Sequence, residues 1–204
     1  SYYERHNTLD AKATAYWKAI RKRAGVDEDI QKTIDATDMQ KEAAANWSAY
    51  SAGKLVDKTL YNIRRERACE FMAEGYRTDD LRRWRSLDQL MTTPYFIEGF
   101  KIWGDYYPEK YAEAAKEDKT YELIYGVDNS NANVSDPALS KYVRPYQIAR
   151  TLAYDGYTWK MAHYLSPIAI QHFMITAKET DYSDSPIYQN PGWPLTASQP
   201  ADDI

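Results

Sequence analysis

The sequence contains very little cysteine and histidine and no long hydrophobic run. Cys69 is the only cysteine among 204 residues, which excludes a disulfide within the chain and a cysteine-based zinc cluster. The histidines His6, His163 and His172 do not have the spacing of metal ligands. No apolar stretch of this sequence is long enough to span a bilayer. The sequence therefore favours neither a zinc protein nor a membrane-spanning helix.

Motifs of the common catalytic classes are also missing. The sequence has no HExxH motif, no EF-hand loop, no glycine-rich phosphate loop and no G-x-S-x-G nucleophile elbow. A glycosidase needs only two carboxylates at a set separation, and the chain has 30 acidic residues, but no pair stands out from the charge pattern. We therefore predict a protein that is not an enzyme and that uses no cofactor or metal.

The charge of the chain is small and mixed. A net charge of −4 gives no general attraction to nucleic acid or to an anionic membrane. Arginines cluster between residues 64 and 85, which raises the alternative of a phosphate-binding strip. Acidic residues alternate with these arginines within each turn, so we expect ion pairs within and between helices instead.

Aromatic residues are unusually frequent, with 19 tyrosines and 6 tryptophans. Each offers a flat apolar face and a polar edge, which suits the C–H face and the hydroxyls of a sugar ring. The same residues also fill cores and protein interfaces, so composition alone leaves sugar binding as one of several alternatives.

Helical spacing dominates the first 91 residues. Leu9, Ala13, Tyr16 and Ile20 predict one apolar stripe, on a helix that begins at Thr8 and stops at Gly25. A short helix around Ile30 and Ile34 and a helix capped by Asp38 follow.

The stretch NIRRERACEFMAEGYRTDDLRRW, in residues 62–85, predicts two consecutive helices interrupted at Gly75. We expect the first over 56–73, and the second over 79–91 with Thr78 as its N-cap. Cys69 lies near the apolar side, so a buried and inert thiol is expected. The apolar side is predicted to contain Ile63, Phe71, Met72, Leu81 and Trp84.

Residues 94–160 have a different character, because proline, glycine and asparagine interrupt an aromatic-rich sequence. We expect one helix near 108–116 and short strands near 121–125 and 141–145. The segment IWGDYYPEKY is typical of a rigid loop that presents aromatic rings rather than burying them. The candidate sugar-stacking residues are therefore Trp103, Tyr106, Tyr107, Tyr95 and Tyr111.

Residues 62–85 resemble the signature IRRERxxEFxxEGxRxxDLRRW of the SusD/RagB family, the surface glycan-binding lipoproteins of Bacteroidetes. Three other stretches resemble family segments in the same order: AYWKAIRKRAG at 15–25, YLSPIAIQHF at 164–173 and QNPGW at 189–193. The sequence departs from the family pattern at Ala169, where a second proline is usual, and near His172, where an acidic or polar residue is usual.

The resemblance implies a mainly α, irregular helical and loop-rich SusD-like C-terminal region. Such a region normally packs on an N-terminal tetratricopeptide-like helical half, which we expect to be absent from this chain. We expect one region over 1–204, divided into a helical signature core at 8–91, a variable aromatic-rich stretch at 92–160 and a terminal segment at 161–204. The signature residues expected to form a structural polar network are Arg64, Glu66, Arg67, Glu70, Arg82 and Trp84.

The resemblance also implies a function without catalysis. The protein is expected to bind oligosaccharide or polysaccharide at the surface of the outer membrane and to deliver it to a SusC-like TonB-dependent transporter. A lipid anchor would belong to an N-terminal segment that is not in this chain. The alternative is a structural lid or interaction subunit of the transporter complex, with a peptide ligand or no direct sugar ligand. A hydrolase is the third hypothesis.

Overall fold

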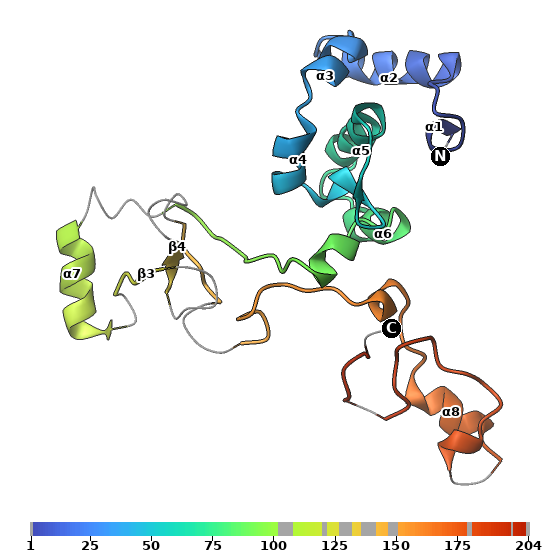
Figure 1. Cartoon of the computed structure of the whole chain (residues 1–204), viewed down its shortest axis with the longest axis vertical. Coiled ribbons are helices and arrows are strands. Elements are labelled where there is room, and N and C mark those ends of the chain that lie inside the picture. Colours follow the sequence, from blue (N-terminus) through green and yellow to red (C-terminus); the bar gives the residue numbers. More distant parts are fainter. Residues whose placement is uncertain are drawn as a thin grey trace. The chain divides into compact units, whose positions relative to one another are not determined.

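The computed structural model (Figure 1) describes residues 2–101, 108–119, 122–126, 132–135, 142–146, 151–178, 181–196 and 198–202. Its α-helices are α1 (Tyr2–His6), α2 (Ala11–Ala24), α3 (Ile30–Ala36), α4 (Met39–Ala45), α5 (Lys58–Glu70), α6 (Arg77–Arg83), α7 (Pro108–Glu117) and α8 (Ile170–Thr176). The protein is therefore mainly α, as the sequence predicts. Contacts group the chain into two compact units, residues 1–89 with 160–204 and residues 90–159. The predicted three-part division of the chain stays a prediction.

Aspartates begin four of the helices in the first unit. Asp10, Asp29, Asp38 and Asp57 precede α2, α3, α4 and α5, and each carboxylate accepts hydrogen bonds from two backbone N–H groups of the first turn. These bonds satisfy donors that a helix cannot pair internally. The prediction of Thr8 as the cap of α2 was wrong, because the Asp10 carboxylate takes this role.

The apolar core of this unit forms where α2, α3 and α5 meet. Trp17, Ile30 and Ile34 are buried there, with Leu9 and Ile63 packed against them. The predicted stripe of α2 was wrong at Tyr16, which is 60% exposed, although Leu9 of the same stripe packs against the core. Turning α2 by about one residue buries the large indole of Trp17, which removes more apolar surface from water than the predicted face would.

The first signature helix, α5, is shorter than predicted. It starts after Asp57 and ends at Glu70. The loop that follows is not helical, since Ala73 and Gly75 have positive φ values of 64° and 83°. Phe71 and Met72 lie in this loop with 38% and 73% of their surface exposed, so their predicted place on the apolar side was wrong. The prediction of a buried Cys69 was also wrong, because this residue is exposed near the end of α5.

The second signature helix, α6, begins earlier and ends earlier than predicted. It starts at Arg77 with Tyr76 in the cap position and no side-chain cap, so the prediction of Thr78 as N-cap was wrong. The helix does not continue to residue 91, since Arg85 has a φ of 50° and a separate 3₁₀ turn, η2, covers Asp88–Met91.

A short antiparallel strand pair lies between α4 and α5 in the sequence. Strands β1 (Tyr50–Ser51) and β2 (Lys54–Leu55) follow the 3₁₀ turn η1 (Trp47–Ala49). The backbone of Ala52 donates to the carbonyl of Arg85, which joins this hairpin to the end of α6.

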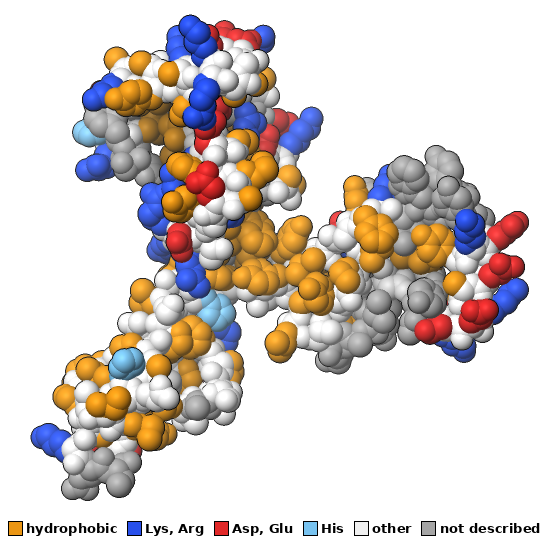
Figure 2. Space-filling view, turned by 180° about the vertical axis from the view of Figure 1, so that it is seen from behind, with side chains coloured by type: hydrophobic (Ala, Val, Ile, Leu, Met, Phe, Trp, Pro, Cys, Tyr) orange, Lys and Arg blue, Asp and Glu red, His pale blue; other side chains and the backbone are white. Residues whose placement is uncertain are grey.

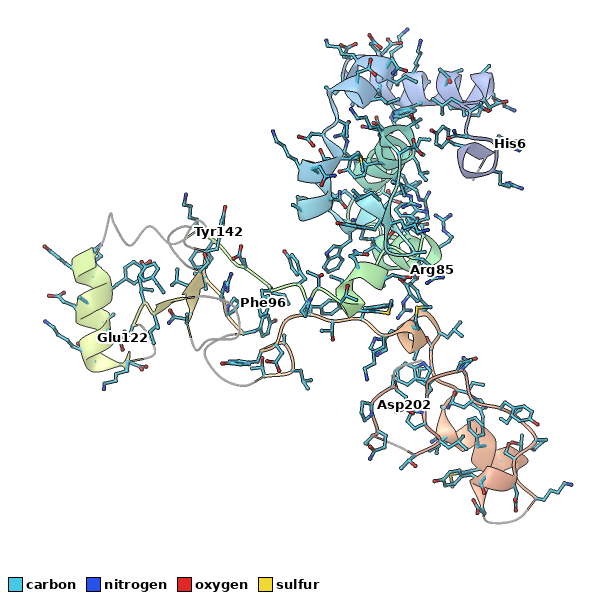
Figure 3. All side chains as sticks on the ribbon, viewed as in Figure 1. His6, Arg85, Phe96, Glu122, Tyr142 and Asp202 are labelled. Carbon is cyan, nitrogen blue, oxygen red and sulfur yellow. The ribbon has the colours of Figure 1, made fainter. Side chains whose placement is uncertain are left out.

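The segment after residue 160 returns to the signature helices through η5, the 3₁₀ turn Met161–Tyr164. The Tyr164 hydroxyl donates to Asp88 at 2.6 Å and accepts from the Leu87 N–H at 3.1 Å. Arg85, labelled in Figure 3, contacts both Asp88 and the Met161 sulfur. These contacts fix the terminal segment to the end of the signature.

The QNPGW segment forms a tight turn. Gly192 has a φ of 77°, and the Trp193 N–H donates to the Asn190 carbonyl at 3.1 Å. Glycine suits this position because a side chain is disfavoured at positive φ. The 3₁₀ turn η6 (Tyr182–Asp184) separates this segment from α8.

The second unit, residues 90–159, contains α7 and a two-stranded parallel pair. Strand β3 (Tyr125–Gly126) pairs with β4 (Val134–Ser135), and isolated bridges join Lys101 to Tyr142 and Val134 to Val143. Val134 is fully buried. The predicted helix at 108–116 is confirmed by α7, and Tyr121 and Lys141, at the start of the predicted strands, lie outside the described residues.

Candidate functional site

The predicted sugar-stacking residues are only partly within the described structure. Trp103, Tyr106 and Tyr107 lie outside the described residues. Tyr111 is half-buried on α7, and Tyr95 is 42% exposed. Of the five candidates, Tyr95 is therefore the described ring that offers the larger surface to a ligand.

Tyr95 forms one half of a pair of exposed tyrosines. Its backbone N–H donates to the Tyr157 carbonyl at 3.0 Å, and the Tyr157 N–H donates back to the Tyr95 carbonyl at 2.7 Å. Because residues directly opposite in an antiparallel bridge place their side chains on the same face, the two Cβ atoms lie about 5 Å apart. Tyr157 is 38% exposed, so both rings reach solvent on one face.

Sequence reasoning missed Tyr157 as a partner of Tyr95. The two tyrosines are 62 positions apart in the printed sequence, and no local pattern links them. Gly156 is the available signal, because a glycine in or next to a strand often marks the close approach of another backbone. Gly156 has a φ of 88°, and a Cβ added there would lie 2.8 Å from the Cβ of Pro94.

Arg144 is a buried arginine of the second unit, residues 90–159. Its side chain is only 4% exposed, and it forms an ion pair with Glu98 at 3.2 Å. The guanidinium also lies over the ring of Phe96, 5.8 Å from the centroid. A buried arginine paired in this way fixes the backbone next to Tyr95, since leaving its charge unpaired would be costly.

Arg64 is the most deeply buried of the predicted network residues. It is 2% exposed, and its guanidinium donates to the carbonyls of Ser48 and Tyr50 and to the Ser51 hydroxyl at 2.7–3.2 Å. The same group lies over the ring of Trp84 at 4.7 Å. Arg64 therefore joins α5 to the hairpin β1–β2 and to the residue after α6.

Asp80 joins the two signature helices. Its carboxylate accepts from Arg67 Nε at 2.8 Å and from Arg83 Nη2 at 2.7 Å. Burial alone would raise the pKa of Asp80, but the hydrogen bonds from Arg67 and Arg83 outweigh it and lower the pKa below its ordinary value. The partner of Arg67 across the two helices is thus an aspartate of α6, not a glutamate.

Glu66 and Glu70 pair with a different helix, α2. Arg21 donates to Glu66 at 3.2 Å, and Arg23 donates to Glu70. The Nε atom of Arg82 is buried and has no hydrogen-bond partner within the described part of the chain. The structure therefore brings five of the six predicted network residues into contacts that join α2, α5, α6 and the hairpin.

The buried Tyr61 and the half-buried Tyr164 have pKa values shifted by their contacts within the fold. Burial, with a hydrogen bond to Glu42, raises the pKa of Tyr61 to about 12. Burial and the bond to Asp88 likewise raise the pKa of Tyr164. A raised pKa keeps each hydroxyl protonated, so both act as hydrogen-bond donors rather than as bases.

The remaining chemistry of the described residues is simple. No group of three or more His, Cys, Asp or Glu side chains that could hold a metal ion occurs among them. None of the helices in the described ranges combines the length and the apolar character that crossing a bilayer requires.

The fold and the exposed tyrosines define a mainly helical protein with aromatic surface groups on an arginine-rich scaffold. The comparison with protein families makes this specific: residues 3–193 match the model described as the SusD family, so the chain belongs to this family. No curated protein and no solved structure matches the chain.

Proposed function

We propose that this protein binds oligosaccharide or polysaccharide at the cell surface and passes it to a SusC-like TonB-dependent transporter without cleaving it. The match to the SusD family over residues 3–193 is the observation on which the proposal depends, because membership of this family suggests glycan binding in nutrient uptake. The outer-membrane location and a lipid anchor outside this chain are parts of the same proposal.

The exposed tyrosine pair supports a stacking mechanism. Tyr95 and Tyr157 present two rings on one face, held by a reciprocal pair of backbone hydrogen bonds. A sugar ring gains by laying its C–H face on such a surface while its hydroxyls stay hydrogen-bonded. We propose that Tyr95 and Tyr157 act together with Trp103, Tyr106, Tyr107 and Tyr111.

The signature residues support a scaffold role in this proposal. The guanidinium of Arg64 and the carboxylate of Asp80 are already engaged by partners in the same chain. A charge that is paired and buried has little left to offer an external ligand. Ligand binding then falls on neutral rings, and stacking with a few hydrogen bonds gives an affinity between about millimolar and micromolar.

The experiment replaces aromatic residues in two sets and measures binding to a glycan panel by calorimetry. The first variant changes Trp103, Tyr106 and Tyr107 to alanine, and the second changes Tyr95 and Tyr157. We expect at least one set to weaken binding about tenfold or more while association with the transporter persists. Absence of heat with every glycan tested would contradict the proposal.

A second candidate function is a structural lid of the transporter complex that holds no sugar itself. The exposed apolar side chains of Phe71 and Met72 favour it, because exposed apolar surface often marks a protein interface. This function predicts that the aromatic variants give the same heat with glycans as the unmodified chain, including the case in which neither gives any. It also predicts that Met72→Lys weakens association with the transporter. Turnover of a chromogenic glycan by the unmodified chain would instead support a hydrolase.

A further inference from the structure

A small cavity lies in the terminal segment of the first unit, away in sequence from the aromatic stretch. It is open to solvent and has a volume of about 210 Å³. Pockets for drug-sized ligands are larger, about 300–1,000 Å³, so this cavity has room for one small ring rather than for a chain. The described residues that line it are Pro167, Ile168, Ala169, Ile170, Gln189, Trp193, Pro194, Thr196, Ser198 and Gln199.

The two walls of this cavity are fixed to each other by side-chain hydrogen bonds. The Gln189 amide donates to the Ile168 carbonyl at 2.9 Å and accepts from the Ile168 N–H at 2.8 Å. Asn190 donates to the Ser166 carbonyl at 2.7 Å. Because these bonds tie the two walls to each other within the chain, binding loses little conformational entropy in the walls.

The ring of Trp193 is also held in place by contacts within the chain. Its Nε1–H donates to the carbonyls of Ala162 and Leu165 at 2.9 and 2.8 Å. The His163 ring lies against it with a centroid distance of 5.7 Å. The polar edge of the indole is thus engaged, and what Trp193 offers to the cavity is apolar ring surface.

The chemistry of the lining selects a neutral ligand. None of the described lining residues is charged, and Figure 2 shows few charged side chains on the surface around α8. Thr196, Ser198 and Gln199 supply hydroxyl and amide groups, and no hydrogen bond to another described residue engages them. An anion would lose its hydration shell here without finding a cation in return.

We propose that the Trp193 cavity, defined by these lining residues, is a subsite for one neutral pyranose ring. The sugar would stack its C–H face on Trp193, and its hydroxyls would bond to Thr196, Ser198 and Gln199. Trp193 is the single aromatic residue among the described residues that line the cavity, which disfavours a proline-rich peptide, since such peptides use grooves with several aromatic rings. This inference deepens the proposed glycan binding.

The test titrates the isotope-labelled chain with the methyl glycosides of glucose, galactose and mannose, and it follows the indole N–H resonance of Trp193 by NMR. We expect saturable shifts with millimolar dissociation constants for at least one glycoside, because a single ring makes few contacts. No shift up to about 100 mM of each glycoside would overturn the proposal. A shift with a Pro-rich peptide and none with any sugar would overturn it too.

Two variants decide whether the cavity itself is responsible. Ala169→Phe fills the cavity without deleting any contact, and we expect it to weaken glycoside binding at least tenfold. Met174→Phe is the control, since Met174 lies on α8, whose N-cap is Ala169, is 60% exposed and does not line the cavity. Equal binding by both variants would overturn the proposal. If Ala169→Phe does not fold, Gln199→Ala replaces it, with a loss of about threefold expected.

The same measurement separates this inference from the proposed function. The variant lacking Trp103, Tyr106 and Tyr107 should keep the Trp193 shift with methyl glycosides even where it loses oligosaccharide binding. A chain that binds oligosaccharide without any change at Trp193 would disprove the subsite and leave the proposed function intact. A Trp193 shift with methyl glycosides in a chain that binds no oligosaccharide would support the subsite alone.

Discussion

The ion pair between Asp80 of α6 and Arg67 of α5 is predicted to be the main electrostatic interaction between these two helices. Its side chain is 8% exposed, whereas those of Arg67 and Arg83 are 36% and 58% exposed. Removing one partner of a buried pair costs about 3–5 kcal/mol. Water can still reach both arginines, which reduces the cost, so we expect Asp80→Asn to lower the free energy of unfolding by about 2–3 kcal/mol.

The assay is urea unfolding followed by circular dichroism. With a slope of about 2–3 kcal/mol per molar urea for a chain of this size, the midpoint should fall by about 1 M. Asp79→Asn is the matched control, because it makes the same chemical change one residue earlier on the exposed face of the same turn. Surface changes of this kind cost about 0.5 kcal/mol or less. An equal loss in the two variants would refute the reasoning.

The pH dependence gives an independent check on Asp80. Its folded pKa is lowered, so its contribution is fully present above the unfolded pKa of about 3.9 and is lost as pH falls through the folded value. The difference in stability between the native chain and Asp80→Asn should therefore shrink below about pH 4. A difference that stays constant to pH 2 would show that the carboxylate acts through packing alone.

Two further predictions concern the second unit and the terminal segment. Gly156→Ala should destabilise the Tyr95 region by more than about 2 kcal/mol, whereas Gly99→Ala should change thermal unfolding little, since the nearest atom to its new Cβ is 3.6 Å away. Burial, and then the charge of Lys160, lower the pKa of His163 in the folded chain. The contribution of the neutral imidazole to stability is therefore complete above the unfolded pKa of about 6.5 and is lost as pH falls through the folded value. His163→Gln should remove this dependence in melting curves measured at several pH values.

Local signals in the sequence predicted the ends of several elements. The Asp38 cap and the stop of α2 at Gly25 were both found where the pattern placed them. Each depends on one residue type whose backbone preference or side-chain acceptor acts within a few positions. Interactions of such short range are visible in a sequence without knowledge of the fold.

Longer-range features were predicted less well, for a physical reason. The orientation of α2 depends on which side chain the neighbouring helices can accommodate, and they accommodate Trp17 rather than Tyr16. The pairing of Glu66 with Arg21 crosses 45 positions, so helical spacing gives no indication of it. The same limit explains why Tyr157 was not recognised beside Tyr95, because bridge register is set by tertiary packing.

The division between scaffold and binding surface follows from where the charges are neutralised. The buried guanidinium of Arg64 bonds to two carbonyls and a hydroxyl of the chain, and the partly exposed Arg67 pairs with the buried carboxylate of Asp80. Recognition of an anionic ligand would require one of these groups to exchange a buried partner for a solvated one, at a cost of several kcal/mol. A neutral glycan requires no such exchange, because ring stacking on Tyr95, Tyr157 or Trp193 leaves every ion pair of the scaffold in place. Salt therefore separates the two cases: binding by this surface should change little between low and high ionic strength, whereas binding of an anion to the arginines should weaken steeply.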